Sequence, residues 1–152
     1  MRLRDQNRRW VSLRGERGRP VLLTFLNSYC RQACPVEGKL LGELWRQRAA
    51  RFDPVLLVVS VNPWQDTPRS VRRFMAEKVG WGGRWHWLLG TPRLLRRIWR
   101  DYGIDVQRGS ADIGHGAALY VIDSRGFERR GYLVPFTPTT VLADLRAISR
   151  ST

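Results

Sequence analysis

The fold is constrained most by two short apolar runs, residues 21–26 and 55–61, which stand on either side of a helical pattern. The second run is almost continuously apolar, as expected of a strand that helices cover on both faces. Between the runs, apolar residues recur at helical spacing from Val36 to about Phe52, and Asp53-Pro54 ends the helix. This order predicts a βαβ unit inside an α/β sheet.

The rest of the chain supplies further strands and helices. We predict a short strand at 9–13, a helix from Asp66 to Gly80, a short strand within 80–89, a helix from Thr91 to about Tyr102, a hairpin of 117–123 with 129–133, and a final helix opened by Thr137. This order is typical of a thioredoxin-like α/β fold, a three-layer sandwich with a central mixed sheet. The chain has 152 residues, 43% of them hydrophobic, and no internal linker, so we expect residues 1–152 to form a single domain.

The two cysteines of the chain, Cys30 and Cys34, lie between the first strand and the first helix. Pro35 suits the first helical position, which places Cys34 at or next to the N-cap. The positive end of the helix dipole favours a thiolate there. Such a pair can serve as a redox pair or share a soft metal ion, and the alternative is two buried apolar cysteines or a structural disulfide.

His115 is the second candidate. It lies in a small-residue loop, 110–116, just before the strand expected at 117–123. Two thiolates and an imidazole suit copper, because thiolates select Cu(I) and imidazole also binds the oxidised ion, whereas structural zinc sites usually have four ligands. The alternative is a loop histidine bonded to backbone. His86, between two tryptophans, is interpreted as a packing residue and is left out of the site.

The net charge of +14 raises the question of nucleic-acid binding. All but Lys39 and Lys78 of the 27 basic residues are arginine. They are spread along the chain, and their two densest groups, within 69–73 and 93–100, fall on the solvent faces of expected helices. No zinc finger, RNP-type strand or recognition helix accompanies them, so we predict no nucleic-acid partner. An acidic protein or an anionic membrane surface remains compatible with the charge.

No apolar stretch reaches the roughly 18–20 residues of a membrane span, and residues 1–5 lack the apolar core of a signal peptide. The chain is therefore expected either to be cytosolic or to have its targeting segment outside this sequence.

Three segments together carry a family resemblance: Cys-x-x-x-Cys-Pro within 21–35, the segment 59–68 ending Asp66-Thr67-Pro68, and His115 ahead of the strand that leads to 122–126. In this order they resemble the Sco/SenC copper chaperones over essentially the whole chain. The resemblance implies a thioredoxin fold with copper bound by Cys30, Cys34 and His115.

The resemblance also implies a role. The protein would deliver copper to the dinuclear copper site of cytochrome c oxidase or reduce the cysteines of that site. Its partner would be the copper-binding subunit of the oxidase or another copper acceptor, and it would be a metallochaperone with thiol redox activity more than a true enzyme. Its location would be the extracytoplasmic side of the bacterial cytoplasmic membrane, through a membrane tether or surface association. We also expect a monomer.

Three residues bear on this resemblance. Asn62 stands where the family often has aspartate, and Arg31 places a cation within the cysteine motif, which favours thiolates but repels a cationic metal. For Asp66 we favour a helix N-cap over a role in orienting a ligand.

The main alternative is a thiol–disulfide oxidoreductase or thiol peroxidase without metal. Three residues separate the cysteines here, instead of the two typical of thioredoxins, and no proline stands just before Ala117. Peroxiredoxins have a threonine or serine three residues before the reactive cysteine. In this chain, Asn27 precedes Cys30 and Arg31 precedes Cys34 at that spacing. A partner-binding domain without chemistry would leave Cys30, Cys34 and His115 without a role.

Overall fold

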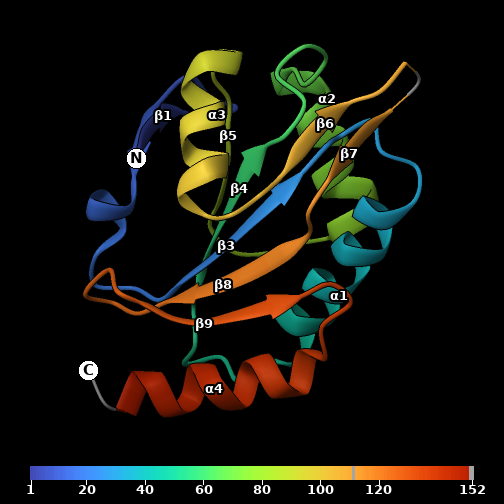
Figure 1. Ribbon diagram of the computed structural model, residues 1–152. Coiled ribbons are helices and arrows are strands. Elements are labelled where there is room, and N and C mark those ends of the chain that lie inside the picture. Colours follow the sequence, from blue (N-terminus) through green and yellow to red (C-terminus); the bar gives the residue numbers. More distant parts are fainter. Residues whose placement is uncertain (111, 151–152) are drawn as a thin grey trace.

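The two apolar runs form the centre of a five-stranded mixed sheet with strand order β5-β4-β3-β8-β9 (Figure 1). The computed structural model describes residues 1–110 and 112–150. Ala111, within the loop expected around His115, and Ser151 and Thr152, at the end of the expected domain, lie outside the described residues.

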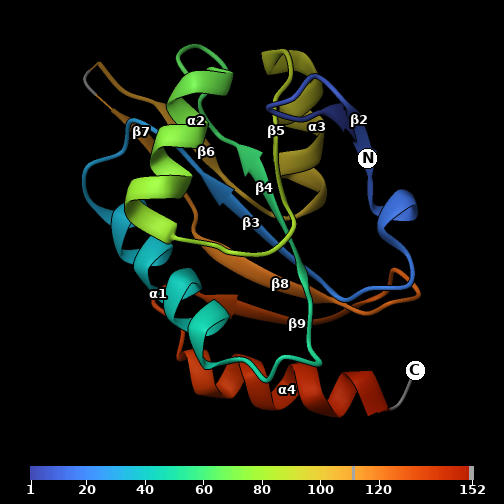
Figure 2. The ribbon, with the colours of Figure 1, turned by 180° about the vertical axis from the view of Figure 1, so that it is seen from behind.

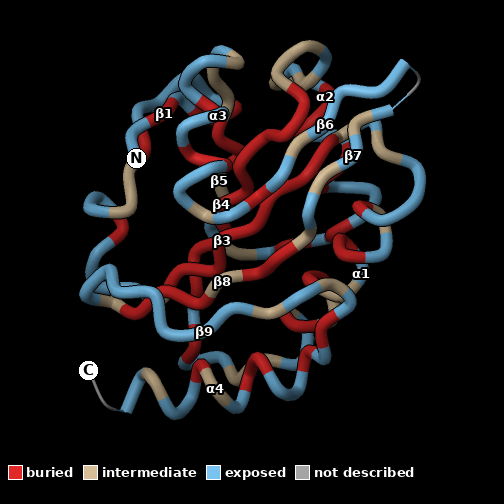
Figure 3. The backbone as a smooth tube through the Cα atoms, in the orientation of Figure 1, coloured by how far each residue is buried: buried red, intermediate tan, exposed pale blue. Residues whose placement is uncertain are grey.

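Strands β3 (Val21–Leu26) and β4 (Val55–Ser60) are parallel, with Val21 opposite Val55. Every residue of both strands is buried (Figure 3). The crossover is α1 (Ala33–Gln47), as the sequence predicts. Strand β5 (Trp85–Leu88) adds in parallel to β4, β8 (Ala118–Ile122) pairs antiparallel with β3, and β9 (Glu128–Leu133) closes the far edge.

The helices form two outer layers, one on each face of the sheet. Successive residues of the central strands point alternately toward one layer and the other. Leu22 and Leu26 point into a core shared with α1, α2 (Pro68–Phe74) and α4 (Pro138–Arg150). Val21, Leu23 and Phe25 point into a second core under α3 (Pro92–Asp101). Figures 1 and 2 show α3 on one face of the sheet and α1 and α2 on the other. The predicted three-layer α/β sandwich is confirmed.

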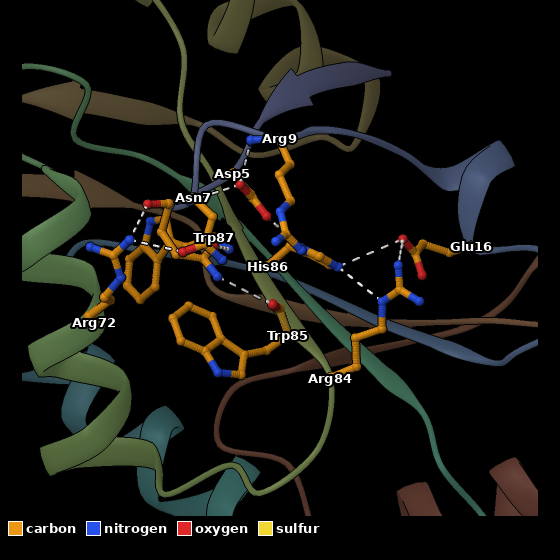
Figure 4. Close-up of polar contacts among 10 residues, drawn as sticks. Asp5, Asn7, Arg9, Glu16, Arg72, Arg84, Trp85, His86 and Trp87 are labelled. Carbon is orange, nitrogen blue, oxygen red and sulfur yellow. Dashed lines mark hydrogen bonds and ion pairs between the residues drawn. The ribbon is translucent and has the colours of Figure 1, made fainter.

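The N-terminal segment covers the edge strand β5. It forms a hairpin of β1 (Arg2–Arg4) and β2 (Trp10–Ser12), followed by the 3-10 turn η1 (Leu13–Glu16). The side-chain carbonyl of Gln6 accepts the backbone N–H of Trp87 at 2.8 Å, and Asp5 Oδ2 lies 2.8 Å from His86 Nδ1 (Figure 4). His86 therefore has a structural role, and its imidazole contributes a polar contact with the N-terminal hairpin in addition to packing.

A second small sheet departs from the sequence prediction. Strands β6 (Val106–Arg108) and β7 (Ile113–His115) form an antiparallel hairpin with Val106 opposite His115. His115 was expected in a loop, but it is the last residue of β7. Each strand has only three residues, and β7 contains a glycine, so no alternating pattern predicts them.

Two helical features complete the fold. Helix α2 runs on into a π-helical turn, η2 (Met75–Val79), and ends at Gly80, whose φ of 66° is left-handed. No helix among residues 1–110 and 112–150 has the length and apolar character to cross a membrane.

Candidate metal centre

The cysteine loop begins where β3 ends, and side chains fix its backbone. Asn27 Oδ1 accepts the N–H of Tyr29 at 3.0 Å, and the carbonyl of Asn27 accepts the N–H of Cys30 at 3.1 Å. These bonds fold residues 27–30 into a turn that aims Cys30 back toward the start of α1.

Asp66 holds the same loop from the connection between β4 and α2. Its Oδ1 accepts both the N–H and the hydroxyl of Ser28, at 3.0 and 2.6 Å, and its Oδ2 accepts the hydroxyl of Ser60 at 2.6 Å. The N-cap of α2 is Thr67, which forms a capping box with Ser70. The prediction of Asp66 as an N-cap is therefore wrong: its carboxylate positions the loop that carries Cys30.

The two cysteines are free and unequal. Helix α1 begins at Ala33, two residues earlier than Pro35 suggests, so Cys34 is its second residue and is 1% exposed. The N–H of Cys34 donates to Cys30 Sγ at 3.4 Å. Cys30 is half-buried.

A shared hydrogen bond sets the ionisation of the pair. The Cys34 thiol donates to the Cys30 sulfur, which lowers the pKa of Cys30 to about 5 against the effect of burial. The same hydrogen bond, together with burial, raises the pKa of Cys34 well above its ordinary value. The sequence predicted the thiolate at Cys34, but the structure favours it at Cys30, because the Cys34 thiol and, more weakly, the backbone N–H of Cys34 donate to the Cys30 sulfur.

His115 reaches Cys34 across 81 residues of sequence, with Nε2 at 3.4 Å from Cys34 Sγ. Its Nδ1 lies 2.9 Å from the carbonyl oxygen of Gly116. A carbonyl can only accept, so Nδ1 carries the proton and Nε2 presents a lone pair toward the sulfur. This is the tautomer in which a histidine can bind a metal through Nε2.

The three residues that the sequence singles out thus lie together, but as a line of contacts from Cys30 to Cys34 to His115. Within residues 1–110 and 112–150, no three His, Cys, Asp or Glu side chains already converge as a group able to hold a metal ion. Cys30 and His115 are both half-buried. Their side chains would have to turn toward a common point near Cys34.

Glu37, one turn after Cys34, is a nearby residue that the sequence reasoning missed. It is 1% exposed and hydrogen-bonds the hydroxyl of Thr24. Burial raises the pKa of Glu37 to about 8, with a smaller contribution from the charge of Cys30, so the carboxyl group is largely protonated at neutral pH. The sequence did contain a clue to this buried pair. Thr24 is a polar residue inside an apolar strand, and Glu37 falls on the inner face of α1.

The donor set fits a soft ion. Two sulfurs and one imidazole nitrogen are available, and the neutral Glu37 adds no carboxylate. Thiolates with imidazole suit copper, whereas a closed zinc site usually has a fourth ligand.

Comparisons with known proteins bear on the family and the fold. The SCO1/SenC family model matches residues 2–150. Among solved structures, Arabidopsis thaliana ScoI with copper bound superposes with a TM-score of 0.88 at 18% identity, covering 100% of this chain and 97% of that one. A SCO1/SenC family lipoprotein from Bacillus anthracis gives a TM-score of 0.88 at 17% identity, covering 98% and 92%. Yeast Sco1 with copper bound gives 0.83 at 16%, covering 99% and 87%. A comparison with curated protein sequences gave no match.

Proposed function

This chain belongs to the SCO1/SenC family, and we propose that it binds one copper ion through Cys30, Cys34 and His115 and transfers it to a copper acceptor during cytochrome c oxidase assembly. One observation carries this proposal: His115 Nε2, with its lone pair free, lies 3.4 Å from Cys34 Sγ, beside a second cysteine whose pKa is about 5. The Arabidopsis thaliana and yeast structures that superpose on this chain hold copper.

Each residue has a distinct part in binding. Cys30 is a thiolate at neutral pH, so it can meet the ion first. Cys34 keeps its proton until the ion arrives, because its sulfur is buried and donates to Cys30. Binding should therefore release about one proton per ion at neutral pH, the proton of the Cys34 thiol.

Release to an acceptor needs an open side. Cys34 forms the buried wall, whereas Cys30 and His115 are half-buried. Since His115 ends a short hairpin outside the main sheet, an incoming thiolate of an acceptor could approach the ion from that side. The acceptor that fits this proposal is the copper-binding subunit of the oxidase.

A second candidate function is reduction of a disulfide in the acceptor, which the low pKa of Cys30 favours. The Cys30 thiolate would attack one sulfur of the acceptor disulfide and displace the other as a thiolate. Cys34, after losing its proton, would then attack Cys30 Sγ and release the second acceptor thiol. The two electrons come from the Cys30–Cys34 pair, which ends as a disulfide.

The setting of the protein belongs to the same proposal. We propose a single domain over residues 1–152, a monomer, and a place on the extracytoplasmic side of the bacterial cytoplasmic membrane. The lipoprotein from Bacillus anthracis supports this location.

Copper content tests the proposal directly. Reduced protein should retain one equivalent of copper after gel filtration, and Cys30→Ser or Cys34→Ser should retain none. His115→Gln should weaken Cu(II) more than Cu(I), since two thiolates still hold the softer ion.

His86→Gln is the matched control, because it removes the other histidine of the chain and lies outside the site. Copper retention that is equal in all four variants would refute the ligand assignment. Copper transfer to an oxidase-subunit fragment, compared with insulin reduction, separates delivery from disulfide chemistry.

A further inference from the structure

A cleft of about 620 Å³ opens between α3 and β6, on the sheet face that carries α3. Figure 1 shows both elements on that face. Trp64 and Trp99 provide aromatic surface, and the guanidinium groups of Arg96, Arg100 and Arg108 line the cleft. Its volume is large enough for several side chains of a bound peptide.

The positive charge in this cleft is not neutralised. Among residues 1–110 and 112–150, Arg96 and Arg100 have neither a hydrogen-bond nor an ion-pair partner for their guanidinium groups. Arg108 stacks over the ring of Trp64 at 4.8 Å, which orients its guanidinium. The single acid in the lining, Asp105, accepts a hydrogen bond from Gln107 at 2.9 Å.

A second cleft of similar volume, about 600 Å³, provides a comparison. It lies beside the N-terminal hairpin, and its lining balances Arg2 and Arg97 against Asp101 and Glu128. The excess of arginine is therefore a property of the cleft between α3 and β6, and arginine forks without partners favour carboxylates.

Both walls of the cleft are connected, by strand pairing or hydrogen bonds, to residues that support the candidate copper site. Val106 pairs with His115 across the β6–β7 hairpin, and the N–H of Gly116 donates to the carbonyl of Asp105 at 3.0 Å. On the other wall, Trp99 Nε1 donates to the carbonyl of Ser60 at 3.0 Å. Ser60 in turn donates to Asp66, which holds the cysteine loop. A molecule in the cleft would contact strand β6, which pairs with His115, and helix α3, which is linked to the cysteine loop through Ser60 and Asp66.

We propose that this cleft docks an extended, carboxylate-bearing segment of the copper-acceptor protein, with at least two Asp or Glu side chains reaching Arg96, Arg100 and Arg108. The proposal rests on the proposed function for the identity of the partner. A protein segment fits better than a membrane, because the arginines line a concave cleft, which a bilayer surface cannot fill. Docking there would place the acceptor beside strand β6, whose partner strand carries the proposed copper ligand His115.

The test measures binding of an acidic probe to the reduced, metal-free protein. The probe is a fluorescein-labelled peptide of alternating Asp and Gly, and a peptide of alternating Asn and Gly is its neutral control. The Arg96→Gln/Arg100→Gln variant should bind the acidic peptide roughly tenfold more weakly by fluorescence anisotropy at low salt. The Arg93→Gln/Arg97→Gln variant has the same net charge and the same two changes on α3 outside this cleft, and it should lose no more than about twofold.

Equal weakening by the two double variants would overturn the proposal, since the binding would then follow net charge alone. Loss of binding to phosphatidylglycerol vesicles in Arg96→Gln/Arg100→Gln, without loss of peptide binding, would also overturn it in favour of a membrane surface. The copper content of the same variants distinguishes a failure of the docking proposal from a failure of the proposed copper-binding function. Unchanged copper retention with lost peptide binding supports the docking cleft, whereas absent copper retention in the parent protein refutes the proposed function alone.

Discussion

Removal of the Asp66 carboxylate should destabilise the protein and release the cysteine loop. Asp66 accepts three hydrogen bonds, two from Ser28 and one from Ser60. In Asp66→Ala the hydroxyl of Ser28 keeps its bond to Ser70, and that of Ser60 still accepts the N–H of Asn62. Among residues 1–110 and 112–150, the backbone N–H of Ser28 would then be left without a hydrogen-bond acceptor.

The expected magnitude follows from these bonds. Three hydrogen bonds at about 1 kcal/mol each give about 3 kcal/mol. Burial raises the pKa of Asp66, so part of this is offset when the carboxylate no longer has to be desolvated. We expect a loss of about 2 kcal/mol in the free energy of unfolding. Asp66→Asn keeps an acceptor for Ser28 and should lose about 1 kcal/mol.

Urea denaturation followed by tryptophan fluorescence measures this loss, and the alkylation rate of Cys30 reports on the loop. Asp66→Ala should change both, because Ser28 precedes Cys30 by two residues. A loss below about 0.5 kcal/mol, or a normal alkylation profile in a destabilised variant, would refute the role of Asp66 in positioning the loop.

Three further outcomes are expected. Cys34→Ala should raise the pKa of Cys30 from about 5 toward its ordinary value, because the thiol donor is lost, and the pH dependence of iodoacetamide alkylation measures this shift; an unchanged profile would contradict the shared hydrogen bond. Burial raises the pKa of Glu37 in the folded state to about 8, from an ordinary value of 4.5. Between pH 4.5 and 8 the folded state therefore binds more protons than the unfolded state, and the free energy of unfolding should fall as pH rises through this range. Glu37→Gln should flatten that slope in urea unfolding, and a slope equal to that of the parent would exclude Glu37 as its source. Oxidation to a Cys30–Cys34 disulfide should abolish copper uptake reversibly, and uptake by protein shown by mass to lack free thiols would count against the cysteine ligands.

The arrangement of the main sheet was predictable because its strands have strong local signals. Residues 21–26 and 55–60 are apolar at nearly every position, and both became central strands buried on two faces. The hairpin of β6 and β7 could not be predicted in the same way. Its three-residue strands are held by pairing with each other, which no period in the sequence records.

The site was predictable in its residues and less so in its chemistry. Cys30, Cys34 and His115 stood out by type and position, and the resemblance to a family placed them together. Which cysteine ionises depends on a thiol–thiol hydrogen bond and on the burial of Cys34, both set by tertiary packing. The roles of Asp66 and Glu37 depend equally on partners in β3 and on the loop that follows it, which local patterns do not reveal.

X-ray absorption spectroscopy of the copper-loaded, reduced protein tests the ligand set most directly. We predict two sulfur ligands and one imidazole nitrogen in the parent protein, with the nitrogen lost in His115→Gln and retained in His86→Gln. A coordination shell of nitrogen and oxygen without sulfur, or an imidazole signal that survives in His115→Gln and disappears in His86→Gln, would contradict the assignment of Cys30, Cys34 and His115.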